Sequence, residues 1–255
     1  MSSQTGTLLR IASSQLPTRW GMFNAIGFER ALADGGRVET ALAIVMGDLA
    51  AGVPLLRIHS QCFTGEVLGS LRCDCHDQLE MAMRGIASEG RGLVIYEYQE
   101  GRGIGLMAKL KAYGLQDGGL DTVEANHALG FKADYRDFCL ATAILRDLGV
   151  KRVRLLSNNP RKVAALMDGG VEVDQLACEA APNPHALAYL KAKKERMGHA
   201  LSLAPSDFVR APDTDARDDP GVADRRCSGL RRRRGFRAGH DRHAVGRSPA
   251  QPSVE

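Results

Sequence analysis

The sequence predicts an α/β fold, in which a mixed, α+β-like sheet carries flanking helices. Apolar segments of strand length, such as residues 93–98, alternate along the chain with segments whose apolar residues recur at helical spacing. Such alternation is typical of α/β domains. The chain has 255 residues and is 44% hydrophobic, which is enough for one sizeable core, and an aromatic content of only 5% makes that core mainly aliphatic.

The first half of the chain is expected to be rich in strands. Alternating apolar residues predict two strands that lead into the core, and the longer apolar run that follows predicts a buried strand. Apolar residues from Leu79 to Ala87 then recur at helical spacing, and Gly90 and Gly92 fit the end of that helix. The strands are expected around residues 16–23, 38–47, 53–62 and 93–98.

The second half begins with a Gly-rich turn at 100–105, followed by a short helix through Tyr113. Residues 115–131 are polar and interrupted by glycine, and their length is unusual for a simple connector, which indicates a functional segment. The remaining pattern predicts a helix at 138–148, a strand at 153–156, a turn at 157–160, and helices at 160–167 and 185–197.

Composition divides the chain into a folded domain at 1–204 and a tail at 205–255 that is expected to be disordered. The tail holds eleven Arg, no Lys and eight acidic residues, so it carries three of the four net positive charges. The run RRRR at 231–234 can touch RNA, but a nearly neutral folded body argues against a nucleic-acid-binding protein. No apolar stretch is long enough to span a membrane and no signal peptide is evident, so we expect a cytoplasmic protein without a membrane partner.

Three of the six cysteines lie within fourteen residues, in the pattern Cys62-x10-Cys73-x-Cys75. In a cytosolic chain such clustering favours metal binding or catalysis over disulfide bonds. Three protein ligands leave one position of tetrahedral zinc open, which is the mark of a catalytic site. Zinc in such a site lowers the pKa of a bound water to about 7.

Two other interpretations of the cysteines stay open at this stage. The three thiols can be ordinary buried core residues. Alternatively, His59 or His76 can supply a fourth ligand and close the metal shell, which would make the site structural rather than catalytic.

Charged residues stand at several predicted strand and helix ends. The turn Glu100-Gly101-Arg102 precedes a helix, where backbone N–H groups and an Arg can bind an anion, although Gly-rich turns are often only turns. Asp134 and Arg136 also precede a helix, where capping and a surface ion pair are the simpler explanation. Neither a Walker A motif nor G-x-G-x-x-G is present, so a nucleotide site here is of another kind.

Together, four stretches in this order resemble the GTP cyclohydrolase II family, and the likeness extends over about residues 10–200. The stretches are RIHSQCFTGEVLGSLRCDCHDQLE, YQEGRGIGLMAKLKAYGLQD, DTVEANHALGFKADYRDF and VRLLSNNPRKV. The resemblance implies zinc-dependent hydrolytic opening of the GTP imidazole ring. The implied products are formate, pyrophosphate and 2,5-diamino-6-ribosylamino-4(3H)-pyrimidinone 5′-phosphate, in the first step of riboflavin biosynthesis.

The resemblance also implies the roles of individual residues. It assigns one Zn²⁺ per chain to Cys62, Cys73 and Cys75, and Mg²⁺ to the GTP triphosphate. It implies a proton acceptor at Asp134, a nucleophile toward the α-phosphate at Arg136 and an active-site tyrosine at Tyr113. An Arg nucleophile is chemically awkward, so stabilisation of phosphate charge is the alternative role for Arg136. The implied contacts to GTP are Arg57, Ile58, His59, Ser60, Gln61, Gln78, Glu100, Gly101, Arg102, Thr122, Ser157 and Lys162.

Relatives of this kind are typically homodimers, and a homodimer is therefore expected. The sequence departs from the family pattern at Gln61, where Glu is frequent, at Ser157, where Thr is frequent, and at His76, where a small residue is frequent. The fifty residues before the cysteines are too few for the extra domain of fused relatives, so we expect a monofunctional protein.

Two alternative functions remain. One is a paralogue that performs a partial reaction, with a formamide product or only pyrophosphate release, and the other is a non-catalytic module that binds zinc and GTP.

Overall fold

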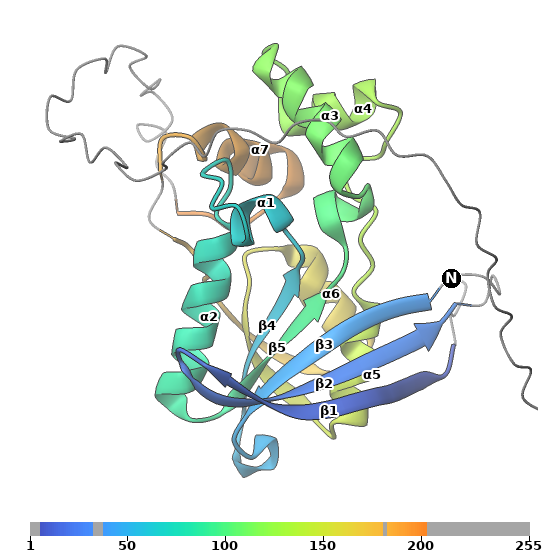
Figure 1. Cartoon of the computed structure of the whole chain (residues 1–255), viewed down its shortest axis with the longest axis vertical. Coiled ribbons are helices and arrows are strands. Elements are labelled where there is room, and N and C mark those ends of the chain that lie inside the picture. The colour runs from blue at the N-terminus through green and yellow to red at the C-terminus, as the bar shows by residue number, and fades with distance from the viewer. Residues whose placement is uncertain (1–5, 33–37, 181–182, 203–255) are drawn as a thin grey trace, which may run out of the picture. The chain divides into compact units, whose positions relative to one another are not determined.

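The computed structural model describes residues 6–32, 38–180 and 183–202, and the expected tail lies outside these residues (Figure 1). One seven-stranded mixed sheet has the order β1-β2-β3-β5-β4-β6-β7. Helices flank this sheet, so the predicted fold class is confirmed. The strands are β1 Leu8–Thr18, β2 Gly21–Ala31, β3 Val38–Met46, β4 Leu55–Ser60, β5 Gly92–Glu97, β6 Arg152–Leu156 and β7 Glu172–Leu176.

The N-terminal part of the sheet is antiparallel and differs in one respect from the sequence prediction. The single strand expected around 16–23 is wrong, because this segment holds the turn between β1 and β2. Thr18 stabilises the turn: its hydroxyl accepts from the backbone N–H of Trp20 at 3.2 Å and donates to the carbonyl of Gly21 at 2.8 Å. The strand expected at 38–47 is β3, which pairs antiparallel with both β2 and β5.

The remaining strands, β5, β4, β6 and β7, are parallel to one another. Helical segments connect them: α2 Cys75–Glu89 leads from β4 to β5, and α6 Pro160–Asp168 leads from β6 to β7. The sequence analysis missed β7. Its five residues are largely exposed at the edge of the sheet, and they lack the apolar run that marked β4 and β5.

The two faces of the sheet are covered by different helices. The apolar stripe of α2 packs on one face, where Ala82, Met83 and Ile86 contact Leu55 and Val94. On the other face, α5 Cys139–Asp147 and α6 cover the larger apolar cluster. Asn159, which lies in the turn expected at 157–160, caps α6 by accepting from the backbone N–H of Arg161. The largest fully buried side chains of this larger cluster are Phe28, Leu56, Ile58, Leu93, Ile95, Ile144, Leu145, Leu155 and Leu166.

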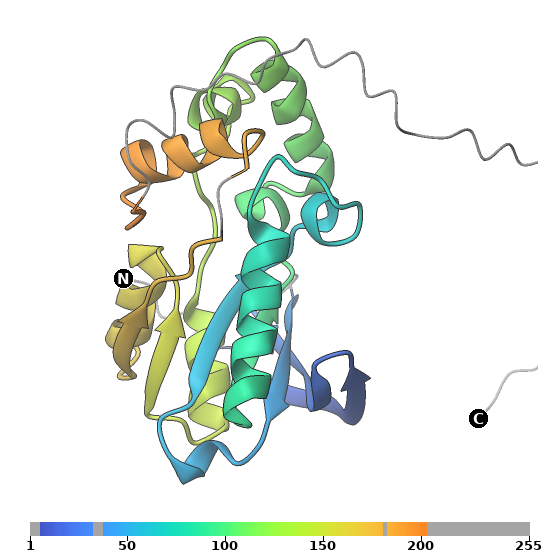
Figure 2. The same ribbon diagram turned by 90° about the vertical axis from the view of Figure 1, so that its left-hand side faces the viewer.

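A third group of helices lies beyond the carboxyl ends of β4 and β5, and both views show it above the arrowheads (Figures 1 and 2). The long connector expected at 115–131 is wrong in part, because α3 continues to Asp117 and a further helix follows. Asp121 and Glu124 form a reciprocal capping box at the start of that helix. The group comprises α1 Phe63–Glu66, α3 Leu106–Asp117, α4 Thr122–Ala128 and α7 Leu187–Met197, with short 3-10 turns at Leu49–Ala51 and Glu100–Gly103 elsewhere in the fold.

Within the described residues, no helix combines the length and the apolar character needed to cross a membrane.

Leu155 provides a test of the core, because it lies fully buried in the larger cluster on β6. We expect Leu155→Ala to lower the free energy of unfolding by about 2–5 kcal/mol, through lost apolar burial and the cavity that remains. The matched control is Met167→Ala on α6, whose side chain is exposed, and its effect should stay within about 0.5 kcal/mol. Urea denaturation at 25 °C measures both; equal losses would contradict the assigned core.

Candidate active site

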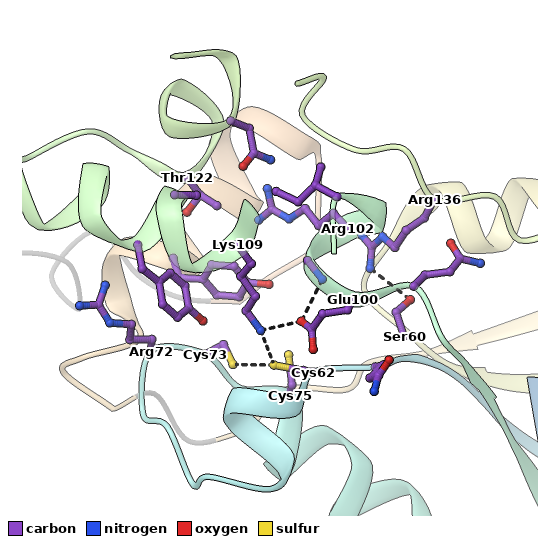
Figure 3. Close-up of a pocket in the computed structure, with 18 of the residues that line it drawn as sticks. Ser60, Cys62, Arg72, Cys73, Cys75, Glu100, Arg102, Lys109, Thr122 and Arg136 are labelled. Atoms are coloured by element: carbon purple, nitrogen blue, oxygen red, sulfur yellow. Dashed lines mark hydrogen bonds and ion pairs between the residues drawn. The ribbon is translucent and has the colours of Figure 1, made fainter. Parts of the chain in front are cut away.

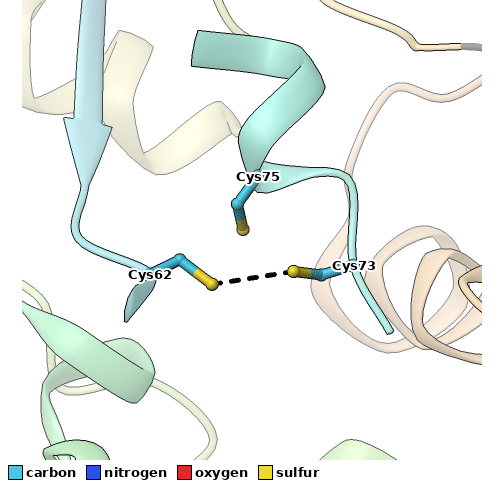
Figure 4. A group of neighbouring side chains, drawn as sticks. All are labelled: Cys62, Cys73 and Cys75. Atoms are coloured by element: carbon cyan, nitrogen blue, oxygen red, sulfur yellow. Dashed lines mark hydrogen bonds between the residues drawn. The ribbon is translucent and has the colours of Figure 1, made fainter. Parts of the chain in front are cut away.

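Three cysteine sulfurs meet at the carboxyl end of β4 (Figure 4). Cys62 follows this strand, Cys73 lies in the returning loop, and Cys75 is the first residue of α2. All three Sγ atoms lie within 4.8 Å of one another, and those of Cys62 and Cys73 are 3.6 Å apart. The loop passes close to them at Gly65, where a Cβ would lie 3.1 Å from Cys73 Sγ, so only glycine fits there without displacement.

The described part of the chain supplies no fourth metal ligand to this cluster. Both ring nitrogens of His59 are already engaged, Nε2 with Glu66 at 3.0 Å and Nδ1 with the Nε–H of Arg57 at 3.4 Å. Burial lowers the pKa of His59 to about 4, so the ring is neutral. His76 is exposed on α2 and outside the cluster. The geometry therefore favours an open three-cysteine site over a closed structural one.

A lysine that the sequence analysis did not single out lies against the cysteines (Figure 3). Lys109 Nζ is 3.2 Å from Cys62 Sγ and 2.8 Å from Glu100 Oε1. Hydrogen bonds from Cys73 and Cys75 hold the pKa of the Cys62 thiol well below its usual value, and the charge of Lys109 acts in the same direction. The hydrogen bond with Cys62 is the main cause that raises the pKa of Cys73 and that of Cys75, so the cluster favours one thiolate at Cys62, and binding of a metal would release the other two protons.

The Gly-rich turn after β5 forms the opposite wall of the same cavity, as Figure 3 shows. Glu100 is buried, and its carboxylate accepts from the backbone N–H of Phe63 at 2.7 Å and from that of Gly101 at 2.9 Å. Together with Lys109, these bonds hold Glu100 between the turn and the cysteine loop. The carboxylate therefore has a structural role in joining the two loops.

Arg102 has the most unusual environment in the site. It is the only non-glycine residue with positive φ among the described residues, at φ 61° and ψ 33°. Its side chain is buried, and Nη1 and Nη2 have no hydrogen-bond partner within the described chain. A buried polar group without a partner costs about 1–3 kcal/mol, and more for a charged group. Such strain and lost hydrogen bonding in one cavity residue indicate a ligand site for an anion.

Asp134 and Arg136 form a bidentate ion pair, with Nε–Oδ1 at 3.0 Å and Nη2–Oδ2 at 2.8 Å. Arg161 adds a further contact to Asp134 Oδ2 at 3.0 Å. Burial raises the pKa of Asp134, but the hydrogen bonds and charge of Arg136 outweigh it, and the pKa lies below its usual value. Burial lowers the pKa of Arg136, but the hydrogen bonds and charge of Asp134 outweigh this effect, and the pKa of Arg136 is raised. Both groups are therefore charged at neutral pH.

Most of the other residues in the sequence hypothesis line the same cavity as the cysteines. The hydroxyl of Tyr113 is 3.3 Å from that of Thr64, and Arg72 lies over its ring. Arg136 Nη1 donates to Ser60 Oγ at 3.4 Å, which brings the ion pair to the cavity wall. This cavity is lined by Ser60, Gln61, Cys62, Cys73, Cys75, Glu100, Gly101, Arg102, Tyr113, Thr122 and Arg136, among others.

A second, adjoining cavity holds most of the remaining residues and is strongly cationic. Arg57 Nη2 donates to Gln78 Oε1 at 2.6 Å, and Lys162 Nζ donates to the carbonyl of Ile58 at 2.8 Å. Burial, and then the charge of Arg57, hold the pKa of Lys162 well below its usual value. Arg57, His59, Gln78, Ser157 and Lys162 line this cavity, and it shares Ser60, Cys75, Arg102, Arg136 and Tyr189 with the first.

Ile58 and Asp134 stand apart from the cavity walls. The side chain of Ile58 is fully buried in the apolar core, so only its backbone is directed toward the site, through the carbonyl that Lys162 contacts. Asp134 lines neither cavity and acts through Arg136. This arrangement makes a direct contact between Asp134 and a substrate in the cavity difficult without rearrangement.

Four residues near the site were missed by the sequence analysis. Lys109 lies four residues before Tyr113 on α3 and therefore shares its helix face, which is a signal that the sequence contained. Tyr189, Lys193 and His199 line the second cavity from α7 and the turn after it, about 130 residues beyond the cysteines. A local sequence pattern cannot predict that residues so far apart in the chain line the same cavity.

Glu97 is a further buried group, at the end of β5. Both of its carboxylate oxygens lack a hydrogen-bond partner within the described residues, and burial raises its pKa to about 8. The carboxyl is therefore mostly protonated at neutral pH, which avoids an isolated buried charge.

Comparison with known proteins agrees with this geometry. A family model described as GTP cyclohydrolase II matches residues 9–177. Two proteins named GTP cyclohydrolase-2, from Escherichia coli strains SMS-3-5 / SECEC and 55989 / EAEC, are each 51% identical to the chain over 197 residues, or 76% of this chain and 98% of theirs.

Among solved structures, a two-domain 3,4-dihydroxy-2-butanone 4-phosphate synthase from A. baumannii matches with a TM-score of 0.40 and 20% identity, covering 68% of this chain and 41% of that one. A likeness at this level supports no functional conclusion. The family match and the 51% identity over nearly the whole length of the relatives are decisive, and this chain belongs to the GTP cyclohydrolase II family.

Proposed function

We propose that this enzyme hydrolytically opens the imidazole ring of GTP, the first step of riboflavin biosynthesis. The products would be formate, pyrophosphate and 2,5-diamino-6-ribosylamino-4(3H)-pyrimidinone 5′-phosphate. The observation that carries this proposal is a three-cysteine cluster that opens into a cavity containing Arg102, whose buried Nη1 and Nη2 have no hydrogen-bond partner among the described residues. A metal site beside an anion site suits a substrate with both a ring to be hydrolysed and a triphosphate. We further propose that the protein acts in the cytoplasm as a homodimer.

The donor set of the cluster fits one Zn²⁺ per chain. With Zn–S bonds of about 2.3 Å, tetrahedral geometry places sulfurs about 3.8 Å apart, and Cys62 and Cys73 are already at 3.6 Å. Cys62, Cys73 and Cys75 would hold the ion. Zinc bound there would supply Lewis acidity, which activates water for attack on the guanine ring. Lys109 would offset the negative charge of the three thiolates through its contact with Cys62.

Cationic side chains in both cavities support triphosphate binding. Arg102 and Arg136 border the cysteine cavity and Arg57 lies in the adjoining one, where a bound phosphate would favour protonation of Lys162, whose pKa burial holds well below its usual value. Within the described residues, the cysteines are the only group of three or more metal-binding side chains that come together. Mg²⁺ would therefore enter with the phosphates of the substrate, the usual arrangement for this ion, rather than in a protein cage.

The ion pair of Asp134 and Arg136 bears on the role of Arg136. A guanidinium held by a bidentate carboxylate, with its pKa raised, keeps its proton and is a poor nucleophile. The same arrangement fixes a planar cation in front of Ser60, where it can stabilise charge on a phosphate. We therefore favour charge stabilisation by Arg136, with Asp134 as the residue that orients it.

Formate release from GTP, measured on purified full-length protein together with its zinc content, tests the function directly. We expect stoichiometric formate and pyrophosphate, with about one zinc per chain. Pyrophosphate without formate would contradict ring opening and favour the partial reaction. Folded protein that binds GTP and zinc but releases neither product would instead indicate the non-catalytic module.

The metal assignment predicts that Cys73→Ser loses most of its zinc and all detectable formate release, because two thiolates cannot retain the ion with the same affinity. Cys139→Ser is the matched control, since Cys139 is exposed on α5 and lies outside the cluster. Zinc is measured by metal analysis after dialysis against a weak chelator. Unchanged zinc in Cys73→Ser would show that the ligands are assigned wrongly.

The role of Arg136 predicts different results for two substitutions. If the residue stabilises charge, Arg136→Lys keeps a cation and should retain more activity than Arg136→Ala, for which we expect a loss of about 10²–10³-fold in kcat. Because a Lys amine can itself act as a nucleophile, charge stabilisation further requires that no adduct is trapped on residue 136 in the active Arg136→Lys variant. Steady-state formate release measures both variants, with zinc content as the control for folding. Trapping of an adduct on Arg136 would refute charge stabilisation as its main role.

A further inference from the structure

Helix α7 and the turn after it contribute side chains to the cationic cavity. This segment lies outside all the sequence motifs that were used to identify the site. The helix lies beyond the carboxyl ends of the parallel strands in both views, coloured orange (Figures 1 and 2). Tyr189, Lys193 and His199 line this cavity together with Arg57, Ser157 and Lys162. The C-terminal helix and the turn after it therefore form part of the lining of this cavity.

This wall is held in place by polar contacts at several points. Lys193 Nζ forms a buried ion pair with Asp74 Oδ1 at 2.6 Å, and Asp74 lies between two of the cysteines. At the end of the helix, the backbone N–H of Ala200 donates to the carbonyl of Asn158 at 3.0 Å. Arg196 joins α7 to the capping box of α4 through Asp121 at 2.8 Å. Side chains carried by this segment are therefore fixed relative to the cysteine loop.

The turn after α7 directs His199 into the cavity. The helix ends at Gly198, whose left-handed φ of 65° allows the chain to fold back, and the backbone N–H of His199 donates to the carbonyl of Lys193 at 3.1 Å. Nε2 of His199 is buried and has no hydrogen-bond partner within the described residues. Burial, and then the charges of Lys193, Arg136, Lys162 and Arg102, lower its pKa to about 3.

Two buried polar groups that have no hydrogen-bond partner among the described residues thus line one cavity. Arg102 contributes Nη1 and Nη2 from the Gly-rich turn, and His199 contributes Nε2 from the C-terminal side. The ring centroid of Tyr189 lies 5.3 Å from Arg102 Cζ and 4.4 Å from Lys193 Nζ. A surplus of cations around donors without partners is the chemistry that binds a polyphosphate.

We propose that α7 closes the polyphosphate subsite, with His199 donating from Nε2 to a phosphate oxygen whose neighbours are bound by Arg102. Tyr189 is a positioning residue that keeps the Arg102 guanidinium in place. The proposal relies on the proposed function for the identity of the substrate as GTP. The anion chemistry itself depends only on the residues of the cavity.

Inorganic tripolyphosphate is the probe that separates this subsite from the ring chemistry. In calorimetric titrations of full-length protein at fixed salt, we expect His199→Ala to weaken its binding by about tenfold, which corresponds to about 1.4 kcal/mol. His199→Gln retains an amide N–H at similar reach and should recover much of the affinity. Lys191→Ala, exposed on the same helix, should bind as the wild type does. Guanosine, which lacks phosphates, should bind equally to all four proteins.

Three results would overturn the proposal. The first is an unchanged affinity of His199→Ala for tripolyphosphate, and the second is an equal loss for tripolyphosphate and guanosine, which would indicate a merely structural role. The third is weaker tripolyphosphate binding with an unchanged KM for GTP, which would mean that the subsite binds a free polyphosphate rather than the substrate. Because the titration requires no turnover, a protein that binds tripolyphosphate through His199 but releases no formate would refute the proposed function alone.

Discussion

The parallel pairing of β4 with β5 is the constraint on which the site depends. Their register ends with Ser60 opposite Glu97, and the backbone N–H of Gln61 continues the pairing with the carbonyl of Glu97 at 2.9 Å. The two loops, which Phe63 and Glu100 join across 37 residues of the chain, must therefore leave the sheet side by side. The cysteine loop and the Gly-rich turn are then joined by Glu100, which accepts from the backbone of Phe63. Ligands in α/β proteins bind at such carboxyl edges for this reason.

The distribution of charge around the site explains why it suits an anion, although the folded chain is nearly neutral. The buried carboxylates Asp74, Glu100 and Asp134 are each paired with a cation, namely Lys193, Lys109 and Arg136. Arg102 has no such partner within the described residues, and Lys162 donates to a backbone carbonyl instead. Glu97, the remaining buried carboxyl near these cations, is mostly protonated at neutral pH. The cavity therefore has a net positive charge, which cannot be inferred from the nearly neutral net charge of the folded chain.

Sequence reasoning succeeded where a function depends on residues close together in the chain. The spacing of Cys62, Cys73 and Cys75 indicated one cluster, and the structure brings their sulfurs together. It failed where tertiary context decides. The strand expected around 16–23 is interrupted because β1 and β2 pair antiparallel on either side of a turn, and β7 is a strand because it pairs with β6 rather than because it is apolar. The contribution of His199 depends on a fold that returns the C-terminal helix to the cysteine loop, which no local pattern encodes.

Arg102 shows how local instability and function are connected in this fold. Its left-handed backbone conformation costs on the order of 1–3 kcal/mol, and its buried Nη atoms add the cost of lost hydrogen bonds with water. A relaxed backbone would direct the side chain elsewhere, so the strain is what holds the guanidinium toward the cavity before a ligand enters. An anion that accepts from Nη1 and Nη2 removes the second cost without any rearrangement of the turn. Binding energy is then not consumed in ordering the donor, which is the advantage that preorganised sites have over flexible ones.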